Sequence, residues 1–292
     1  MTDTLSDLTY KVARKLGAVR ESLATGGSTT TLIDLDHLIE ADDFWVEGVI
    51  WILQTTDGLA PIKEYSGIAD FTLSTNLADL HETLTAAIGS GDRYAIGIPR
   101  YGIDALIGVV NEALISMGTI PLVDKSITTV AGQTEYALPS TSFNLDVRKV
   151  SEQRRTGAPD DNEWIKLYDW DIERQVAGTP NKLIFVSGPV GNRLLKIDFL
   201  DIHPELFVTT DALNENVHSD RVVYDAAMFL LEHRLQDPAD DDPSILKQLE
   251  RVETRGILAK AEHPIQKPQR TTKLLTFGNA FSRRSPGDNN PR

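Results

Sequence analysis

Apolar residues at the start of the chain recur at three- and four-residue steps, the spacing of one face of an amphipathic helix. Ser6 or Thr4 can cap the first turn through a side-chain oxygen, and Gly26-Gly27 supplies a stop signal. The pattern predicts a helix over residues 5–24. We expect it to pack within its own subunit, with packing on a neighbouring subunit as the alternative. The apolar stripe consists of Leu5, Leu8, Val12, Leu16, Val19 and Leu23.

From Thr29 to Ile98 the apolar period changes to two, and aromatic and β-branched residues become frequent. Thr56-Asp57-Gly58 and Ser90-Gly91-Asp92 supply the residues that turns require. These features predict a small antiparallel β-subdomain over residues 28–98, inserted between two helices. Its candidate strands are Phe44–Val46, Val49–Leu53, Phe71–Leu73 and Tyr94–Ile96.

A second helical pattern covers residues 103–117, with Gly118 and Pro121 as its stop signals. Short apolar runs beyond it predict an antiparallel β-meander, and residues 171–177 fit a short helix closed by Gly178. The candidate strands of the meander are 127–130, 135–138, 147–152, 164–167, 183–186 and 194–199.

The last periodic segments predict a pair of helices over residues 219–236 and 243–262. Ser219 and Asp220 open the first of them, and Asp242 is the expected cap of the second, with Pro243 at its first position. After these helices the periodic pattern ends.

The predicted fold class is α+β, an α-helical bundle with an antiparallel β-meander, an inserted small antiparallel β-subdomain and an extended C-terminal tail. The length of 292 residues is sufficient for about two domains. The predicted divisions are an N-terminal helix of the bundle at 1–27, the β-subdomain at 28–98, a core of helix, meander and helix pair at 99–262, and the tail at 263–292.

The composition excludes several classes of site. Cysteine is absent, so neither disulfides nor thiolate metal sites can form. No run approaches the roughly 18 apolar residues that a membrane-spanning helix needs, and we expect no contact with a membrane. The first seven residues are polar and acidic, unlike a secretory signal, and we expect synthesis in the cytoplasm.

The net charge of −14 is distributed unevenly. Residues 263–292 carry six basic side chains against one acidic side chain, so residues 1–262 carry −19 (−14 − 5 = −19). An acidic body repels phosphate and argues against general nucleic-acid binding. The basic tail fits either a solvated terminus or a segment that binds nucleic acid or an acidic protein groove.

Motifs that carry chemistry are missing from the chain. We find no glycine-rich dinucleotide or phosphate loop, no His-Glu-x-x-His and no Gly-x-Ser-x-Gly. The six histidines, at 37, 81, 203, 218, 233 and 263, show none of the tight spacings of metal ligands. We therefore expect a protein that is not an enzyme and that needs no cofactor and no metal.

Two residue groups support alternatives to that expectation. Acidic residues gather between positions 34 and 43, and hard cations prefer carboxylate oxygens, although the spacing is not that of a calcium-binding hand. Tryptophans and tyrosines can form an interface or a glycan-binding surface, but core packing is their default role. The acidic group is Asp34, Asp36, Glu40, Asp42 and Asp43, and the tryptophans are Trp45, Trp51, Trp164 and Trp170.

The order of several short motifs resembles the head-to-tail adaptor (connector) proteins of tailed bacteriophages. The similarity covers residues 100–262, and residues 34–97 are similar to small β-modules of phage virion proteins, an insertion that minimal adaptors lack. The motifs are Asn111-Glu112-Ala113-Leu114 at a helix end, Gly132-Gln133-x-x-Tyr136-x-Leu138-Pro139, Val147-Arg148-Lys149-Val150, Gly178-Thr179-Pro180 and Asp198-Phe199.

The resemblance implies a structural virion protein at the head–tail neck. Such proteins form a homo-oligomeric ring, usually a dodecamer, which connects the portal protein to the tail or neck protein below. Genomic DNA passes through the ring without specific binding. The alternatives are a tail-side neck, collar or fibre-attachment protein and, from another class, a glycan-binding or glycan-hydrolysing virion protein.

Family members commonly use a C-terminal tail to grip the portal, and residues 263–292 match that segment in character. The tail is basic and mostly polar, with isolated apolar anchors, and such segments become ordered in complexes. The candidate portal-binding residues are Lys267, Arg270, Lys273, Leu274, Leu275, Phe277, Phe281, Arg283 and Arg284.

Overall fold

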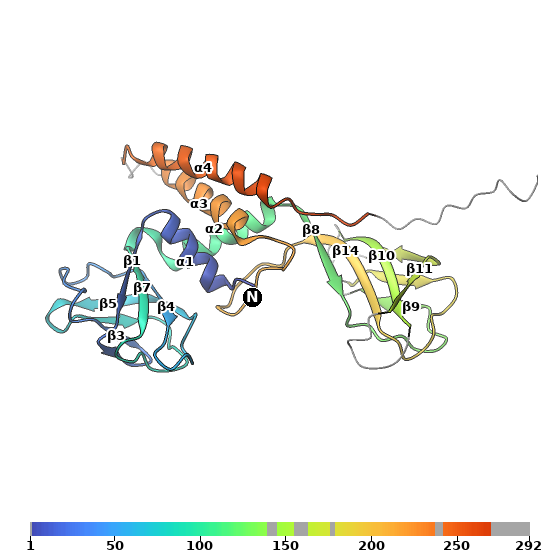
Figure 1. Ribbon diagram of the computed structural model, residues 1–292, viewed down its shortest axis with the longest axis horizontal. Helices are drawn as coiled ribbons and strands as arrows, with labels where there is room; N and C mark the ends of the chain where they lie inside the picture. Colours follow the sequence, from blue (N-terminus) through green and yellow to red (C-terminus); the bar gives the residue numbers. More distant parts are fainter. Residues whose placement is uncertain (1, 139–144, 155–162, 176–178, 237–241, 270–292) are drawn as a thin grey trace, which may run out of the picture. The chain divides into compact units, whose positions relative to one another are not determined.

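A computed structural model describes residues 2–138, 145–154, 163–175, 179–236 and 242–269 (Figure 1). It combines α-helices with antiparallel sheets, as the predicted α+β class requires. The chain divides into two compact units, the first formed by residues 1–120 and 201–266 and the second by residues 121–200 and 267–292. No helix in the described ranges is both long enough and apolar enough to span a membrane.

The first unit contains a seven-stranded sheet, and every strand pairing for which a register is defined is antiparallel. Aromatic and branched side chains form its core, among them Trp45, Phe71 and Tyr94. In spatial order the strands are β1 (Val19–Leu23), β7 (Arg93–Gly97), β4 (Val49–Gln54), β5 (Tyr65–Thr72), β6 (Leu77–Leu80), β3 (Thr31–Ile33) and β2 (Gly26–Gly27).

The expected strand at Phe44–Val46 is wrong. The chain turns there, with Asp43 and Glu47 at positive φ of 63° and 65°. Trp45 is nevertheless buried in the core of the sheet, so its burial rather than strand pairing accounts for the apolar run.

The N-terminal helix is shorter than predicted. Helix α1 (Leu5–Lys15) begins with a capping box between Thr4 and Asp7 and ends before Gly17, which has a φ of +70°. The predicted helix over 5–24 is therefore wrong beyond Lys15. Val19 and Leu23 also fit an alternating pattern, and pairing of β1 with β7 satisfies their backbone groups in a sheet.

The remaining helices follow the predictions closely. They are α2 (Ile103–Ser116), α3 (Ser219–Gln236) and α4 (Ile245–Glu262). Helix α4 begins two residues later than expected, and the Asp242 carboxylate accepts a hydrogen bond from the backbone N–H of Ser244 at 2.9 Å. Helix α3 packs against α1, α2 and α4 (Figure 1).

The second unit is built of two small sheets over one apolar cluster that includes Tyr136, Val150 and Leu183. The first sheet has the order β11 (Trp164–Leu167), β10 (Asp146–Gln153), β14 (Leu195–Ile202) and β8 (Thr119–Asp124). The second has the order β12 (Trp170–Glu173), β13 (Lys182–Phe185) and β9 (Glu135–Ala137).

Two expectations for this unit are wrong. Residues 127–130 form no strand and make only a single bridge, between Thr128 and Leu194. The predicted helix over 171–177 begins instead as strand β12, because Trp170 to Glu173 pair with β13 in antiparallel register. Residues 176–178, including the expected stop at Gly178, lie outside the described residues, as does Pro139.

The two compact units differ from the predicted domains. The sheet predicted as a separate insertion over 28–98 shares its unit with the four helices of the described residues. The reason lies where α1 meets the sheet. The indole N–H of Trp51 on β4 donates to Thr9 Oγ1 at 3.1 Å, and Lys63 pairs with Asp7 at 2.7 Å.

Thr9→Val tests this contact between helix and sheet. The substitution keeps the side-chain shape but leaves the buried Trp51 N–H without its acceptor, and both side chains are at most 1% exposed. We expect the free energy of unfolding to fall by about 1–3 kcal/mol, measured by urea denaturation followed by tryptophan fluorescence.

Thr254→Val is the matched control, because the Thr254 hydroxyl donates to the Glu250 carbonyl on an exposed face of α4. Its effect should stay within about 0.5 kcal/mol. Equal losses for the two variants would show that the contact with Trp51 contributes nothing specific.

Candidate functional site

Of the proposed portal-binding residues only Lys267 lies in the described part of the chain, where it is exposed in a segment without regular structure. The other proposed positions, from Arg270 to Arg284, lie outside the described residues. The other candidate sites are the two clusters suggested by the sequence and the exposed face of the helices.

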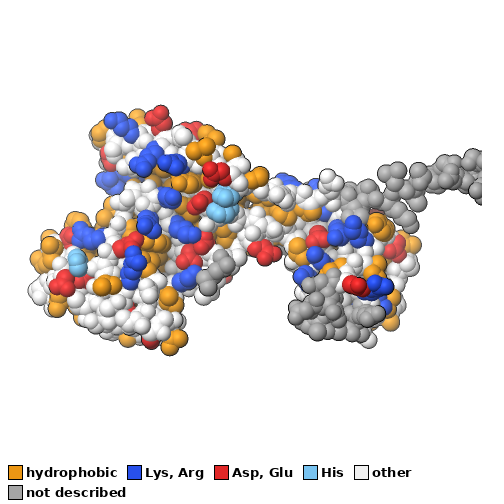
Figure 2. Space-filling view, viewed as in Figure 1, with side chains coloured by type: hydrophobic (Ala, Val, Ile, Leu, Met, Phe, Trp, Pro, Cys, Tyr) orange, Lys and Arg blue, Asp and Glu red, His pale blue; other side chains and the backbone are white. Residues whose placement is uncertain are grey.

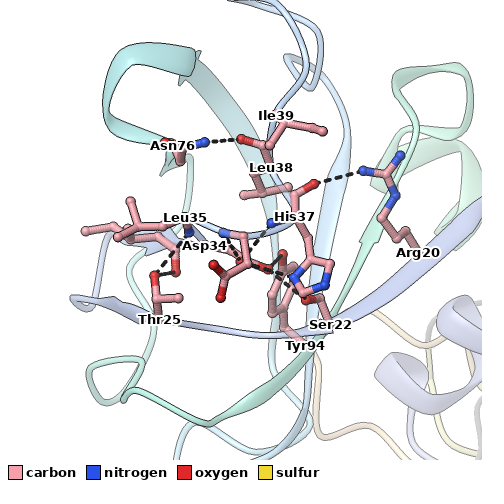
Figure 3. A network of polar contacts seen from close by, with 12 residues as sticks. Arg20, Ser22, Thr25, Asp34, Leu35, His37, Leu38, Ile39, Asn76 and Tyr94 are labelled. Atoms are coloured by element: carbon pink, nitrogen blue, oxygen red, sulfur yellow. Dashed lines mark hydrogen bonds and ion pairs between the residues drawn. The ribbon is translucent and has the colours of Figure 1, made fainter.

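Asp34 is the centre of a polar network rather than part of a cation site (Figure 3). Its carboxylate is 0% exposed and accepts hydrogen bonds from the hydroxyls of Ser22 and Tyr94, both at 2.7 Å. The backbone N–H groups of Asp36 and His37 also donate to it. Burial alone would raise the pKa of Asp34, but these four donors hold it below its ordinary value.

Ser22, His37 and Asp34 come together but do not form a catalytic triad. In a triad the imidazole lies between the other two groups and uses a different nitrogen for each. Here the Ser22 hydroxyl donates directly to Asp34, and His37 Nδ1 faces both the Ser22 hydroxyl, at 2.9 Å, and Asp34, at 3.4 Å (Figure 3). The serine proton is therefore engaged by the Asp34 carboxylate, and a single nitrogen of His37 faces both groups instead of bridging them.

Glu40 and Asp42 of the 34–43 segment have separate partners. Glu40 pairs with Arg20 at 2.6 Å and accepts from the indole N–H of Trp45, and Asp42 accepts from the backbone N–H of Leu73. Within the described ranges, no three carboxylates of this segment lie close enough together to hold a metal ion. A cation site at this segment therefore has no geometric support.

The tryptophans of the first unit do not form a glycan-binding surface. Trp45 and Trp51 are buried, as the default expectation of core packing predicts. Trp164 and Trp170 of the second unit are half-buried, and the Trp170 indole N–H donates to the Leu167 carbonyl at 3.0 Å. The glycan alternative therefore has no support from the first unit.

The exposed face of α4 is the most distinctive surface of the first unit. Ile245, Val252, Gly256 and Ala259 are buried, and Lys260 near the helix end pairs with the buried Asp225 of α3 at 2.8 Å. Large apolar side chains nevertheless point outward from α4. Leu246 is 63% exposed, Ile257 62% and Leu258 50%.

Between Leu246 and Leu258 the exposed charged and large apolar side chains of α4 fall into two flanks of opposite charge. Successive residues of a helix are about 100° apart, so the flanks lie on either side of the face that α3 covers. Lys and Arg side chains and apolar side chains share the surface at the top of the view, where α4 lies (Figure 2). We define the acidic flank as Leu246, Glu250, Glu253 and Ile257, and the basic flank as Lys247, Arg251, Arg255 and Leu258.

Like charges repeat along each flank. Lys247, Arg251 and Arg255 follow one another at four-residue steps, and Glu250 and Glu253 are three residues apart. Such neighbours repel and destabilise an isolated helix by roughly 0.2–0.5 kcal/mol per pair. Within the described residues none of the five forms an ion pair. A partner that supplies the opposite charge to each flank would relieve this repulsion.

The apolar period of residues 243–262 does not show which of these side chains the neighbouring helix covers, so the sequence alone did not reveal this surface. Of residues 256–258, Gly256 packs inward, close to Tyr224 of α3. The repeated basic residues were a visible signal, but the identity of the covered face was needed to interpret them.

Comparison with models of known protein families gives no match, and comparison with curated proteins gives no significant match.

Asp34→Asn tests the buried network through its pH dependence. Because the folded-state pKa of Asp34 lies below the unfolded value, its contribution to stability is complete above the unfolded pKa, about 4. The contribution is lost as pH falls through the folded-state pKa. We expect the free energy of unfolding of the variant to be about 1.5–3 kcal/mol lower than that of the unaltered protein at pH 7. This difference should shrink below about pH 4.

Asp36→Asn is the matched control for this experiment, since Asp36 is exposed two residues away. Denaturant titrations from pH 7 to pH 3 measure all three proteins. A difference between the Asp34 variant and the unaltered protein that stays constant over this range would contradict a charged Asp34 as the stabilising group.

Proposed function

We propose that the chain is a non-enzymatic connector of a tailed-phage virion, assembled as a ring at the head–tail neck between the portal and the tail. The observation that carries the proposal is the opposite charge of the two exposed flanks of α4. The motif order that resembles head-to-tail adaptors supports it, with α1 to α4 as the helical bundle and the strands of residues 121–200 in the place of the β-meander.

A ring needs an interface in which two different surfaces of each subunit meet, repeated around a closed rotation. The acidic flank of one α4 and the basic flank of the next satisfy this requirement, because every subunit carries both. Leu246 and Ile257 on one flank and Leu258 on the other add apolar area to the contact. Charge complementarity then selects the head-to-tail order and opposes pairing of identical flanks.

The charge of the body fits a channel for DNA. Residues 1–262 carry −19, so a channel lined by this body offers few cations to neutralise phosphates. DNA then passes without being held. The basic tail of residues 263–292 suits the other role, attachment to the portal, which is the expected partner above the ring.

Reversal of charge tests the ring interface. Arg251→Glu with Arg255→Glu gives α4 two acidic flanks, and we expect mass photometry of the chain with its cognate portal ring to show loss of ring-sized complexes. Adding Glu250→Arg and Glu253→Arg in the same chain restores opposite flanks and should restore assembly. If the combined variant does not form ring-sized complexes although its circular dichroism spectrum is unchanged, the result would contradict the α4 interface.

Truncation tests the role of the tail. A chain ending at Gln269 keeps every described residue and removes Arg270 to Arg292, so we expect it to fold as before but to lose assembly on the portal. Arg283→Glu with Arg284→Glu in the full chain should weaken portal binding in the same direction. Assembly of the truncated chain on the portal would contradict a role of the tail in portal binding. Failure of the unaltered chain to bind the portal would contradict the connector function as a whole.

A second candidate function is tail-side attachment, as a neck, collar or fibre-binding protein. Three apolar side chains, Leu35, Ile39 and Phe44, are exposed on the segment between β3 and β4. An exposed apolar group of this kind suits a protein partner. Binding to an isolated tail component that Ile39→Asp abolishes, without any binding to the portal, would favour this function.

A further inference from the structure

Two histidines and an aspartate that are far apart in the sequence meet at the ends of α3 and α4. His218 lies just before α3, Asp220 lies in its first turn, and His263 is the residue that ends α4. One candidate ligand atom from each lies within 4.8 Å of the other two, and among the described residues this is the one such group. On the visible face of the molecule histidine side chains lie at the surface beside acidic ones (Figure 2).

The two imidazole rings are arranged in parallel. Their centroids are 3.6 Å apart and their planes differ by 11°. Two nitrogens bound to one zinc ion, each at about 2.0–2.1 Å in tetrahedral geometry, lie about 3.3–3.4 Å apart. The candidate ligand atoms of the three side chains lie within 4.8 Å of one another, so only a short distance separates them from this arrangement. Because an imidazole lone pair lies in its ring plane, the stacked rings must turn about their side-chain torsions before a nitrogen of each binds the same ion. The Asp220 carboxylate, 4.0 Å from His218 Nδ1, supplies the third ligand.

The backbone around the group is fixed without any metal. The His263 N–H donates to the Ala259 carbonyl at 3.0 Å, and Arg221 of α3 donates to the His263 carbonyl at 3.2 Å. The loop before α3 is held by the N-terminal segment, because the Leu213 N–H donates to the Asp3 carbonyl at 2.8 Å. These bonds place the three side chains together in advance, which reduces the ordering cost of binding.

The group borders a pocket of about 680 Å³ formed within the first unit. Asp3, Glu215 and Glu262 also line it, which favours a cation, and water in the pocket can complete the coordination. Two basic groups lie on this side: the Arg221 guanidinium donates to the His263 carbonyl, and Lys11 pairs with Asp3. The Asp220 N–H donates a weak hydrogen bond to His218 Nδ1 at 3.3 Å. A metal ion bound to that nitrogen would replace this hydrogen bond.

We propose that His218, Asp220 and His263 form a binding site for one divalent transition-metal ion of the zinc class. Two imidazole nitrogens and one carboxylate oxygen suit such an ion, whereas calcium and magnesium prefer oxygen ligands alone. The bound ion joins the first turn of α3 to the end of α4. It thereby fixes the point at which the chain leaves the end of α4.

The test uses the untagged full-length chain, freed of metal with a chelator and then dialysed. Competition against a chromophoric zinc chelator measures affinity and stoichiometry, and the visible absorption of bound Co²⁺ reports on four-coordinate geometry. We expect one equivalent of metal per chain. His218→Ala and His263→Ala should each weaken zinc binding at least tenfold, and Asp220→Asn should weaken it to a smaller extent.

His233→Ala is the matched control, because His233 is an exposed histidine of α3 paired with Glu112 instead. It should bind zinc as the unaltered protein does. A second measurement needs no variant: chemical modification of His218 and His263 by diethyl pyrocarbonate, followed by mass spectrometry, should be suppressed by zinc while modification of His233 is not.

Absence of stoichiometric binding by the unaltered chain, or equal loss of binding in the His233 variant, would overturn the proposal. So would zinc binding that leaves both His218 and His263 open to modification. These measurements use the isolated chain and involve neither portal nor ring, so their outcome is independent of the proposed connector function.

Discussion

The attachment of α1 to the seven-stranded sheet is the contact on which the first unit depends. The buried hydroxyl of Thr9 accepts the indole N–H of Trp51 and donates to the carbonyls of its own helix, so one side chain joins helix and sheet. On its other side α1 packs against α2 and α3, and α3 in turn carries α4. The outward flanks of α4 and the meeting of α3 and α4 at His263 are thus supported by a chain of contacts that ends in the sheet.

The sequence predicted the long helices well and the short elements poorly, for physical reasons. Helices α2 and α3 combine an uninterrupted 3.6-residue period with clear stop signals, so their bounds follow almost directly. The stripe from Leu5 to Leu23 fits a helix throughout, yet Gly17 ends the helix and β7 offers residues 19–23 a paired edge. The segment Trp170–Glu173 is too short for its hydrophobic period to distinguish a helix from a strand. Its pairing with β13 makes it a strand.

The sites depend on contacts between residues that are distant in the sequence, which explains why sequence reasoning found so few of them. An acidic run around Asp34 resembles a cation site until Ser22 and Tyr94 are seen to donate to it. The basic residues of α4 were visible as a repeat, but only the packing of Gly256 against α3 reveals that they face outward. His218 and His263 show no metal-ligand spacing, because two separate helix ends bring them together. The portal-binding residues of the tail stay a prediction.

The chain crosses between the two compact units at residues 120–121, 200–201 and 266–267, and the first two crossings fall in β8 and β14. Those two strands are hydrogen-bonded neighbours in one sheet, so the chain leaves the helical unit and returns to it at adjacent positions. An element whose two ends lie side by side can be lengthened, shortened or exchanged for another without altering the path of the chain that hosts it. Residues 121–200 therefore form a stretch that can be altered in this way while α1 to α4 keep their packing.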